Sequence, residues 1–175
     1  MKRCFICYYH EIILKRKNRP FFEKRLMENV KKSLSGLPYH SVRRLSGRIM
    51  VELVSDSPLE QIGDRLQKVF GLVFCCPAWI SVQKMEQLHE DLWKLVRLQQ
   101  FDTFKIASRR ANKKYPINSQ QINEQLGAIV AERSGKRVRL EQPDLTCYVE
   151  IVEDYAFLYF EKLRGGKGLP VSSSG

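Results

Sequence analysis

The chain has 175 residues, 43% of them hydrophobic, which is enough for one domain of ordinary size or two small ones. No apolar stretch of the sequence approaches the roughly 20 residues needed to cross a bilayer, and we expect the chain to be cytoplasmic. Its 30 lysines and arginines outnumber its 19 acidic residues and give a net charge of +11 at pH 7, a balance that favours nucleic acid or an anionic membrane face as a partner.

Residues 1–76 predict a ferredoxin-like domain. Helices are indicated where apolar residues recur every four positions, as at Leu26, Val30 and Leu34, and where a glycine follows them. In chain order we expect a strand at Arg3–Tyr9, a helix from Pro20 to Gly36, a hairpin of Val42–Leu45 and Arg48–Val54 turning at Ser46-Gly47, a helix from Ser57 to Gly71 and a strand at Leu72–Cys75. This β-α-β-β-α-β order is the ferredoxin-like motif.

Residues 77–165 predict a second α/β unit, because Pro77 interrupts the strand pattern. In chain order we expect a linking strand at Trp79–Val82, a helix at Met85–Gln100, a strand at Phe101–Ala107, a helix from Asn118 or Ser119 to Gly135 and strands at Val138–Leu140, Leu145–Val152 and Tyr155–Phe160. Residues 166–175 are rich in glycine and serine, have no periodicity and are interpreted as a flexible linker. The predicted fold class is therefore α+β.

Two segments of the second unit are basic without containing an acid. The first, Lys105–Tyr115, contains Lys105, Arg109, Arg110, Lys113 and Lys114. We interpret it as a loop that binds a polyanion, with Phe104 and Tyr115 available to stack on bases. The second contains Arg133, Lys136, Arg137 and Arg139. Both segments border the predicted helix over Ile122–Arg133, so we expect them to form one patch. The alternative is a solvated run of surface charge.

A third basic cluster precedes the first predicted helix and contains Lys15, Lys17 and Arg19. The free N–H groups at a helix start attract anions, which makes these residues candidates for phosphate binding. Ordinary exposed charge explains the cluster equally well. The candidate RNA-binding residues are Lys105, Arg109, Arg110, Lys113, Lys114, Arg137, Arg139, Lys15, Lys17 and Arg19.

The sequence offers no catalytic, cofactor or metal site. Its three histidines lie outside any nucleophile motif, and neither a P-loop nor a GxGxxG pattern is present. Cys4 and Cys7 have the spacing of a metal-binding pair, but residues three apart on a strand point to opposite faces. We therefore expect all five cysteines to be reduced and packed in strands.

Several segments together resemble one known family, and they occur in the right order over nearly the whole chain. These are YHEIILKRKNRPFFEKRLMENV near the start, FKIASRRANKKYPINSQQINEQLGAIV, LEQPDLTCYVEIVEDYAFLY with its turn at Pro143-Asp144, and the tail GGKGLPVSSSG. They are similar to the N-terminal half of the tRNA 4-thiouridine synthetases, or tRNA sulfurtransferases, in which a ferredoxin-like domain is packed on an α/β THUMP domain. The tail resembles the linker that leads to the catalytic domain.

The resemblance implies that the chain binds tRNA at the acceptor stem and 3′ CCA end, rather than a membrane. In the family a following pyrophosphatase-loop domain binds ATP, adenylates uridine 8 and receives sulfur from a donor through a cysteine; the family is also linked to thiamine biosynthesis. We expect ATP on that domain and no cofactor in this chain, whose sequence ends before the domain's Ser-Gly-Gly-x-Asp-Ser type motif. A stand-alone tRNA-binding adaptor and a protein-interaction module with a basic face remain alternatives, and neither catalytic status nor oligomeric state follows from the sequence.

Overall fold

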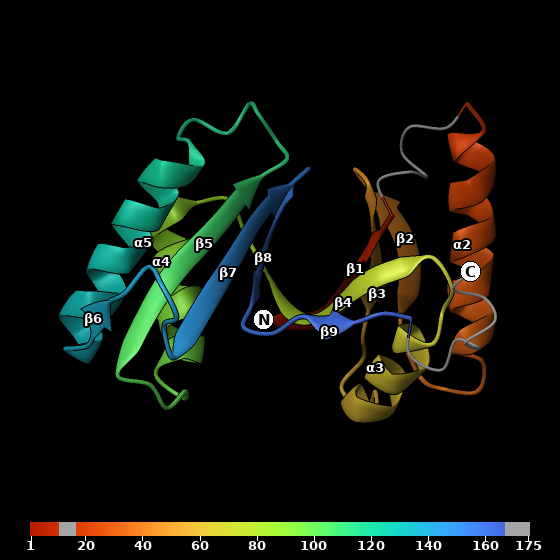
Figure 1. Cartoon of the computed structure of the whole chain (residues 1–175), viewed down its shortest axis with the longest axis horizontal. Coiled ribbons are helices and arrows are strands. Elements are labelled where there is room, and N and C mark those ends of the chain that lie inside the picture. Colours follow the sequence, from red (N-terminus) through yellow and green to blue (C-terminus); the bar gives the residue numbers. More distant parts are fainter. Residues whose placement is uncertain (11–16, 167–175) are drawn as a thin grey trace. The chain divides into compact units, whose positions relative to one another are not determined.

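The computed structural model describes residues 1–10 and 17–166, which form two compact units (Figure 1). The N-terminal unit contains Lys2–Pro77 and the segment that begins at Lys162, and the second unit contains Ala78–Glu161. Both units combine strands with helices, which confirms the predicted α+β class. Within the described ranges, no helix is long and apolar enough to cross a membrane.

The N-terminal unit has the predicted β-α-β-β-α-β order. Its elements are β1 (Lys2–Tyr9), α2 (Arg19–Ser33), β2 (Ser41–Leu45), β3 (Arg48–Glu52), α3 (Leu59–Gln67) and the first part of β4 (Leu72–Ser81). The strands lie in the order β2-β3-β1-β4, and β3 pairs antiparallel with both β1 and β2. The turn between β2 and β3 contains Gly47 at φ 79°, a left-handed conformation that glycine adopts without a steric penalty. The expected hairpin is therefore confirmed.

The core of the N-terminal unit follows from the apolar spacing of its helices. Leu26 and Val30 of α2 and Ile62 of α3 are buried in one cluster. Their spacing places them on one stripe of each helix, and burying each such side chain stabilises the unit by about 1.5–3 kcal/mol. The cluster includes Cys7, and all five cysteines are free and buried, as expected for reduced cysteines packed in strands.

The strand β4 differs from the prediction at Pro77, where we expected one strand to end and another to begin. It is one continuous strand of ten residues. Proline removes a backbone donor, but its fixed φ of about −65° is compatible with extended backbone, so it can lie in a strand wherever that donor is not needed. The sequence shows the proline, but it does not show whether the sheet needs a hydrogen bond from the backbone N–H at this position.

Gly165 was expected near the start of a flexible linker and instead ends a strand pairing. The short strand β9 (Leu163–Arg164), which sequence reasoning missed, pairs antiparallel with Phe74 and Cys75 of β4. The Gly165 N–H donates to the carbonyl oxygen of Val73 at 2.6 Å, and a Cβ at this position would lie 2.0 Å from the carbonyl oxygen of Leu72. Only glycine fits so close an approach. The remaining tail, residues 167–175, lies outside the described residues.

The second unit is built on a mixed sheet. Its elements are the second part of β4, α4 (Met85–Val96), β5 (Thr103–Arg110), α5 (Ser119–Ser134), β6 (Arg137–Val138), β7 (Leu145–Val152) and β8 (Tyr155–Tyr159). The strand order is β4-β8-β7-β5-β6. β5 pairs in parallel with β7, beside which it lies in Figure 1, and with β6, while β8 pairs antiparallel with β4 and β7.

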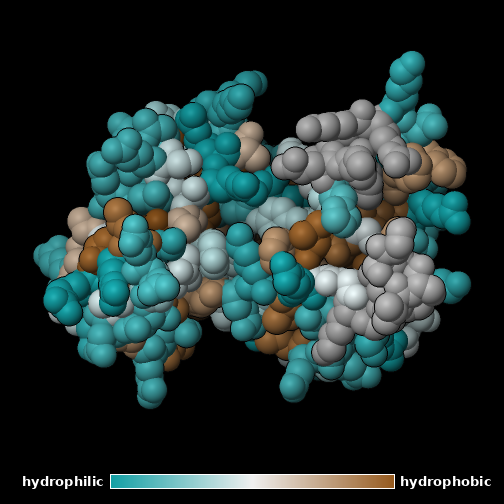
Figure 2. All heavy atoms as spheres, viewed as in Figure 1, coloured by the Kyte–Doolittle hydropathy of each residue, from teal (hydrophilic) through white to brown (hydrophobic). Residues whose placement is uncertain are grey.

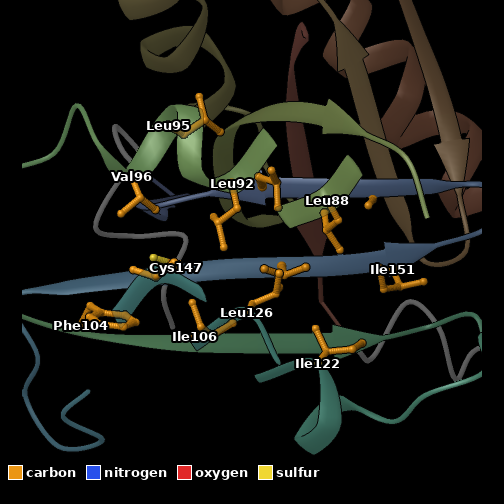
Figure 3. Close-up of a cluster of buried hydrophobic side chains, with 14 of the residues drawn as sticks. Leu88, Leu92, Leu95, Val96, Phe104, Ile106, Ile122, Leu126, Cys147 and Ile151 are labelled. Atoms are coloured by element: carbon orange, nitrogen blue, oxygen red, sulfur yellow. The ribbon is translucent and has the colours of Figure 1, made fainter. Parts of the chain in front are cut away.

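Both helices of the second unit pack on one face of this sheet. Figure 3 shows Leu92 of α4 and Leu126 of α5 gathered with Ile106 of β5 in one buried cluster. Because side chains alternate along a strand, Lys105 and Arg109 lie on the face of β5 opposite to Ile106. The fold thus separates the apolar residues of β5 from two of its cations.

Candidate nucleic-acid interface

The loop that joins β5 to α5, residues 111–118, is held by the last residue of β5. Nη1 of Arg110 donates to the carbonyl oxygen of Tyr115 at 2.7 Å and to that of Ile117 at 3.3 Å. A guanidinium can bridge several carbonyl groups because it carries five donors in a rigid plane. Sequence reasoning interpreted Arg110 as an exposed loop residue that binds RNA. The structure corrects the exposure and the position in a loop: Arg110 ends a strand, is half-buried and fastens the loop. Its RNA-binding role stays a prediction.

Asn112 anchors the same loop to the hairpin of β7 and β8. The N–H groups of Ala111 and Asn112 donate to the carbonyl oxygen of Ile151 at 2.8 and 3.1 Å. The side-chain amide of Asn112 donates to the carbonyl oxygen of Glu153 at 3.1 Å, and its Oδ1 accepts the N–H of Lys114 at 3.1 Å, an Asx turn. The loop backbone is therefore tied down at several points.

The start of α5 closes the loop and is itself fixed. Oδ1 of Asn118 accepts the N–H of Gln121 at 2.9 Å, and the Gln121 side chain accepts the N–H of Asn118 at 2.9 Å, which forms a capping box. Ser108 of β5 donates its N–H to Oδ1 of Asn123 at 2.9 Å and its hydroxyl to the carbonyl oxygen of Ser119 at 2.8 Å. The predicted helix start is confirmed, and the first turn of α5 is hydrogen-bonded to the end of β5.

Three cations of this hydrogen-bonded segment are exposed to solvent. They are Arg109 on β5 and Lys113 and Lys114 in the loop, and all three are exposed. Lys105 lies on the same face of β5 as Arg109 and is half-buried, with Nζ 3.5 Å from the carbonyl oxygen of Leu140. Arg109, which we predicted in a loop, belongs to β5, because the strand extends three residues beyond the predicted end at Ala107. Lys105 belongs to β5 as well, within the range predicted as a strand.

The aromatic residues beside the basic segment are not available for stacking on bases, which contradicts our expectation. Phe104 is fully buried and Tyr115 is 6% exposed, and both belong to the core cluster of the second unit. Burial also raises the pKa of the Tyr115 hydroxyl. In the sequence, an aromatic residue beside several basic residues could either stack on a base or pack in the core. Only its burial in the folded chain distinguishes these two roles.

The second basic segment lies at the other end of β5, so the expected single patch is not formed. Thr103, the first residue of β5, is in register with Arg137, and the N–H of Arg139 donates to the carbonyl oxygen of Phe104 at 2.8 Å. The helix α5, whose 16 residues span about 24 Å, runs from the loop to this end. Arg137 and Arg139 are exposed and form a separate cationic area.

Two further cations of that segment are engaged in ion pairs. Arg133 Nη1 lies 3.2 Å from Oε2 of Glu90, and Lys136 Nζ lies 3.5 Å from Oδ1 of Asp102. The pairing lowers the pKa of the Glu90 carboxyl group. The acidic partners thus partly offset the positive charges of Arg133 and Lys136, unlike those of Arg137 and Arg139.

The third basic cluster is only partly described. Lys15 lies outside the described residues, and Lys17 is exposed in the turn before α2. Arg19 begins α2, and its Nε lies 3.2 Å from Oε1 of Glu23, one helical turn later. Glu23 is 4% exposed, and sequence reasoning missed it because an acid at a buried helix position breaks the apolar pattern.

The cysteines do not form a reactive centre. All five are buried, and burial raises the pKa of the Cys147 thiol to about 12. The pKa of the Cys4 thiol is also raised, chiefly by burial. A thiol with a raised pKa stays protonated at neutral pH and is a poor nucleophile.

On the face seen in Figure 2, hydrophilic residues predominate and apolar residues form only scattered areas.

Both units match known protein families. Residues 4–76 match the ThiI ferredoxin-like domain family, and residues 82–161 match the THUMP domain family. Over 168 residues, 95% of this chain, the sequence is 38% identical to a probable tRNA sulfurtransferase of Moorella thermoacetica. The chain thus contains a ThiI ferredoxin-like domain and a THUMP domain, in the order that these family models give. It covers 43% of that relative and so spans slightly less than half the length of such a tRNA sulfurtransferase.

Two solved structures are similar to this chain over its whole length. PH1313 from Pyrococcus horikoshii Ot3 is 27% identical with a TM-score of 0.83, and the match covers 100% of this chain and 59% of that one. A 4-thiouridine synthetase, crystallised in an RNA complex with bound ATP, is 26% identical with a TM-score of 0.76, and the match covers 100% of this chain and 45% of that one.

Proposed function

We propose that the chain is the tRNA-binding N-terminal region of a tRNA 4-thiouridine synthetase. In this proposal it positions the acceptor stem and 3′ CCA end of tRNA while a further domain, with ATP and a sulfur donor, thiolates uridine 8. The observation that carries the proposal is a THUMP domain with exposed cations at the end of β5 and on the hydrogen-bonded loop that follows it. The similarity to a 4-thiouridine synthetase that forms an RNA complex supports it.

The exposed cations would bind phosphates rather than read bases. Arg109, Lys113 and Lys114 carry three positive charges on a hydrogen-bonded backbone, so RNA binding would not have to order the loop as well as the side chains. Arg137 and Arg139 lie near the start of β5, whose eight residues span about 26 Å, so the two areas would contact phosphates several nucleotides apart. Lys105 and Lys17 would add charge, whereas Arg110 would support the loop.

Removal of the 3′ CCA nucleotides from tRNA tests the proposal. We expect the truncated tRNA to bind the chain more weakly, by about tenfold, because several nucleotide contacts are lost together. The measurement is a titration of intact and truncated transcripts, with a tRNA of scrambled sequence but intact CCA end as control. Equal affinity of the intact and truncated forms would reject the placement of the acceptor end, and absence of any salt-dependent binding would reject the proposed function.

The isolated chain is expected to show no ATP-dependent thiolation of tRNA. Its cysteines are buried, and its cations are arranged for phosphate contact on an open surface rather than around a reacting group. ATP chemistry would therefore depend on residues beyond those of the two units. Incubation of the purified chain with tRNA, ATP and a sulfur donor, followed by nucleoside analysis, should yield no 4-thiouridine, and its appearance in the absence of other proteins would contradict this expectation.

A further inference from the structure

A surface pocket of the N-terminal unit lies where α2 begins beside β2. Its volume is about 490 Å³, and it is lined by Arg19, Pro20, Glu23, Lys24, Met27 and Arg44. Three cations and one carboxylate thus surround it, together with the apolar side chains of a proline and a methionine. Pockets of this size accommodate small ligands or parts of larger ones.

The carboxylate of Glu23 forms the buried anchor of the pocket. Glu23 is 4% exposed and accepts a hydrogen bond from the hydroxyl of Tyr9, which is also buried. Arg19 Nε lies 3.2 Å from its Oε1, and Arg44 Nη1 lies 3.7 Å from its Oε2. A buried carboxylate is costly unless it is paired and hydrogen-bonded, and these three partners satisfy it. Glu23 in turn restrains both guanidinium groups.

The two arginines keep donors available to a ligand. Their side chains are 42% and 49% exposed, although each is paired with Glu23. Arg19 is hydrogen-bonded to Glu23 through Nε, and within residues 1–10 and 17–166 no hydrogen bond is formed by its two terminal nitrogens. Because Glu23 already restrains Arg19 and Arg44, a ligand would lose little entropy in ordering them. With Lys24, the pocket carries a net charge of about +2, counted as three cations and one anion.

We propose that this pocket binds a backbone phosphate of the RNA. Arg19 and Arg44 would donate to its non-bridging oxygens, Lys24 would contribute charge, and Pro20 and Met27 would contact the attached ribose. Glu23 acts as a positioning residue that does not touch the phosphate. The charges favour phosphate over a base, and none of the lining residues that the structure describes is aromatic. This inference rests on the proposed RNA-binding function and adds Arg44 and Lys24 to it.

The register of β2 supplies a matched control for Arg44. Val42 is buried in the cluster that contains Leu26 of α2, so Val42 and Arg44 share the face of β2 that is turned to α2, and Arg43 lies on the opposite face. Arg43→Ala and Arg44→Ala therefore remove the same charge one residue apart on opposite faces. On α2, Lys24 and Lys31 are both exposed and lie about two turns apart on one side of the helix.

Titration of a tRNA transcript against the whole chain over a range of KCl concentrations tests the pocket. Arg44→Ala is expected to weaken binding about tenfold and to reduce the slope of log affinity against log salt by about 0.7–0.9, whereas Arg43→Ala leaves the slope unchanged. Lys24→Glu should reduce the slope likewise and Lys31→Glu should not, which keeps the test valid if loss of Arg44 unfolds the unit. Equal effects within each pair would overturn the pocket. Failure of the unaltered chain to bind tRNA would instead overturn the proposed function.

Discussion

Replacement of Arg109, Lys113 and Lys114 together by alanine should weaken tRNA binding by about 100-fold at low salt. Each side chain is exposed, and if each loses one phosphate contact worth about 1 kcal/mol, the total is about 3 kcal/mol. The slope of log affinity against log salt should fall by about 2–2.7, because each lost contact removes about 0.7–0.9. The fold should persist, since Arg110 and Asn112, which hold the loop, are unchanged.

A triple variant at Lys68, Lys84 and Arg97 is the matched control. These three residues are exposed, and their replacement by alanine removes three positive charges, as in the loop variant, but from other parts of the surface. Titrations of both variants and the unaltered chain over a KCl series distinguish a local site from general attraction between a basic protein and RNA. If the two variants lose affinity equally, or if the loop variant retains full affinity at every salt concentration, the loop is not the phosphate-binding site.

Replacement of Arg110 by alanine should loosen the loop rather than remove a phosphate contact. The carbonyl groups of Tyr115 and Ile117 would each lose a partly buried donor, at a cost of about 1–3 kcal/mol in the free energy of unfolding. For a chain of this length that corresponds to a fall in Tm of about 2–4 °C per kcal/mol. The loop should also open more often, and limited digestion with trypsin should cut faster after Lys113 and Lys114.

The neighbouring arginine provides the comparison for this second variant. Arg109→Ala removes the same charge from an exposed side chain on the opposite face of β5 and should change neither Tm nor the rate of cleavage. In RNA binding the two variants should differ in the opposite way. Arg109→Ala should lower the slope of log affinity against log salt, whereas Arg110→Ala should weaken binding without a comparable change in that slope. Unchanged stability and unchanged trypsin sensitivity in Arg110→Ala would show that its hydrogen bonds do not hold the loop.

Much of the local structure could be predicted from the sequence because its signals are local. The four-residue spacing of Leu26 and Val30 defines the buried stripe of α2, and Gly47 identifies the turn of the β2–β3 hairpin. Asn118 and Gln121, three residues apart, form the capping box that a helix start with this spacing predicts. The order of the elements then follows, and with it the ferredoxin-like motif.

The partners of the polar and charged side chains were decided only by tertiary structure. The periodicity of a segment reports which residues share a face, but not which distant residue meets them. Pairing of β5 with β6 moved Arg137 to the far end of the strand from Lys113, so two basic segments that border one helix do not form one patch. The same limit hid the buried carboxylate of Glu23, whose partners Tyr9 and Arg44 come from β1 and β2.

The basic segment Lys105–Tyr115 illustrates what the sequence alone determines and what only the tertiary structure decides. Its composition alone established an excess of positive charge, and that signal favoured an anionic partner before any fold was known. Whether a given arginine is free to bind a ligand depends on the carbonyl groups that the folded chain brings to it, as at Arg110, and whether an aromatic residue can stack on a base depends on its burial, as at Phe104. Hydrogen bonding and burial are set by residues far apart in the sequence, and therefore only the tertiary structure assigned these roles.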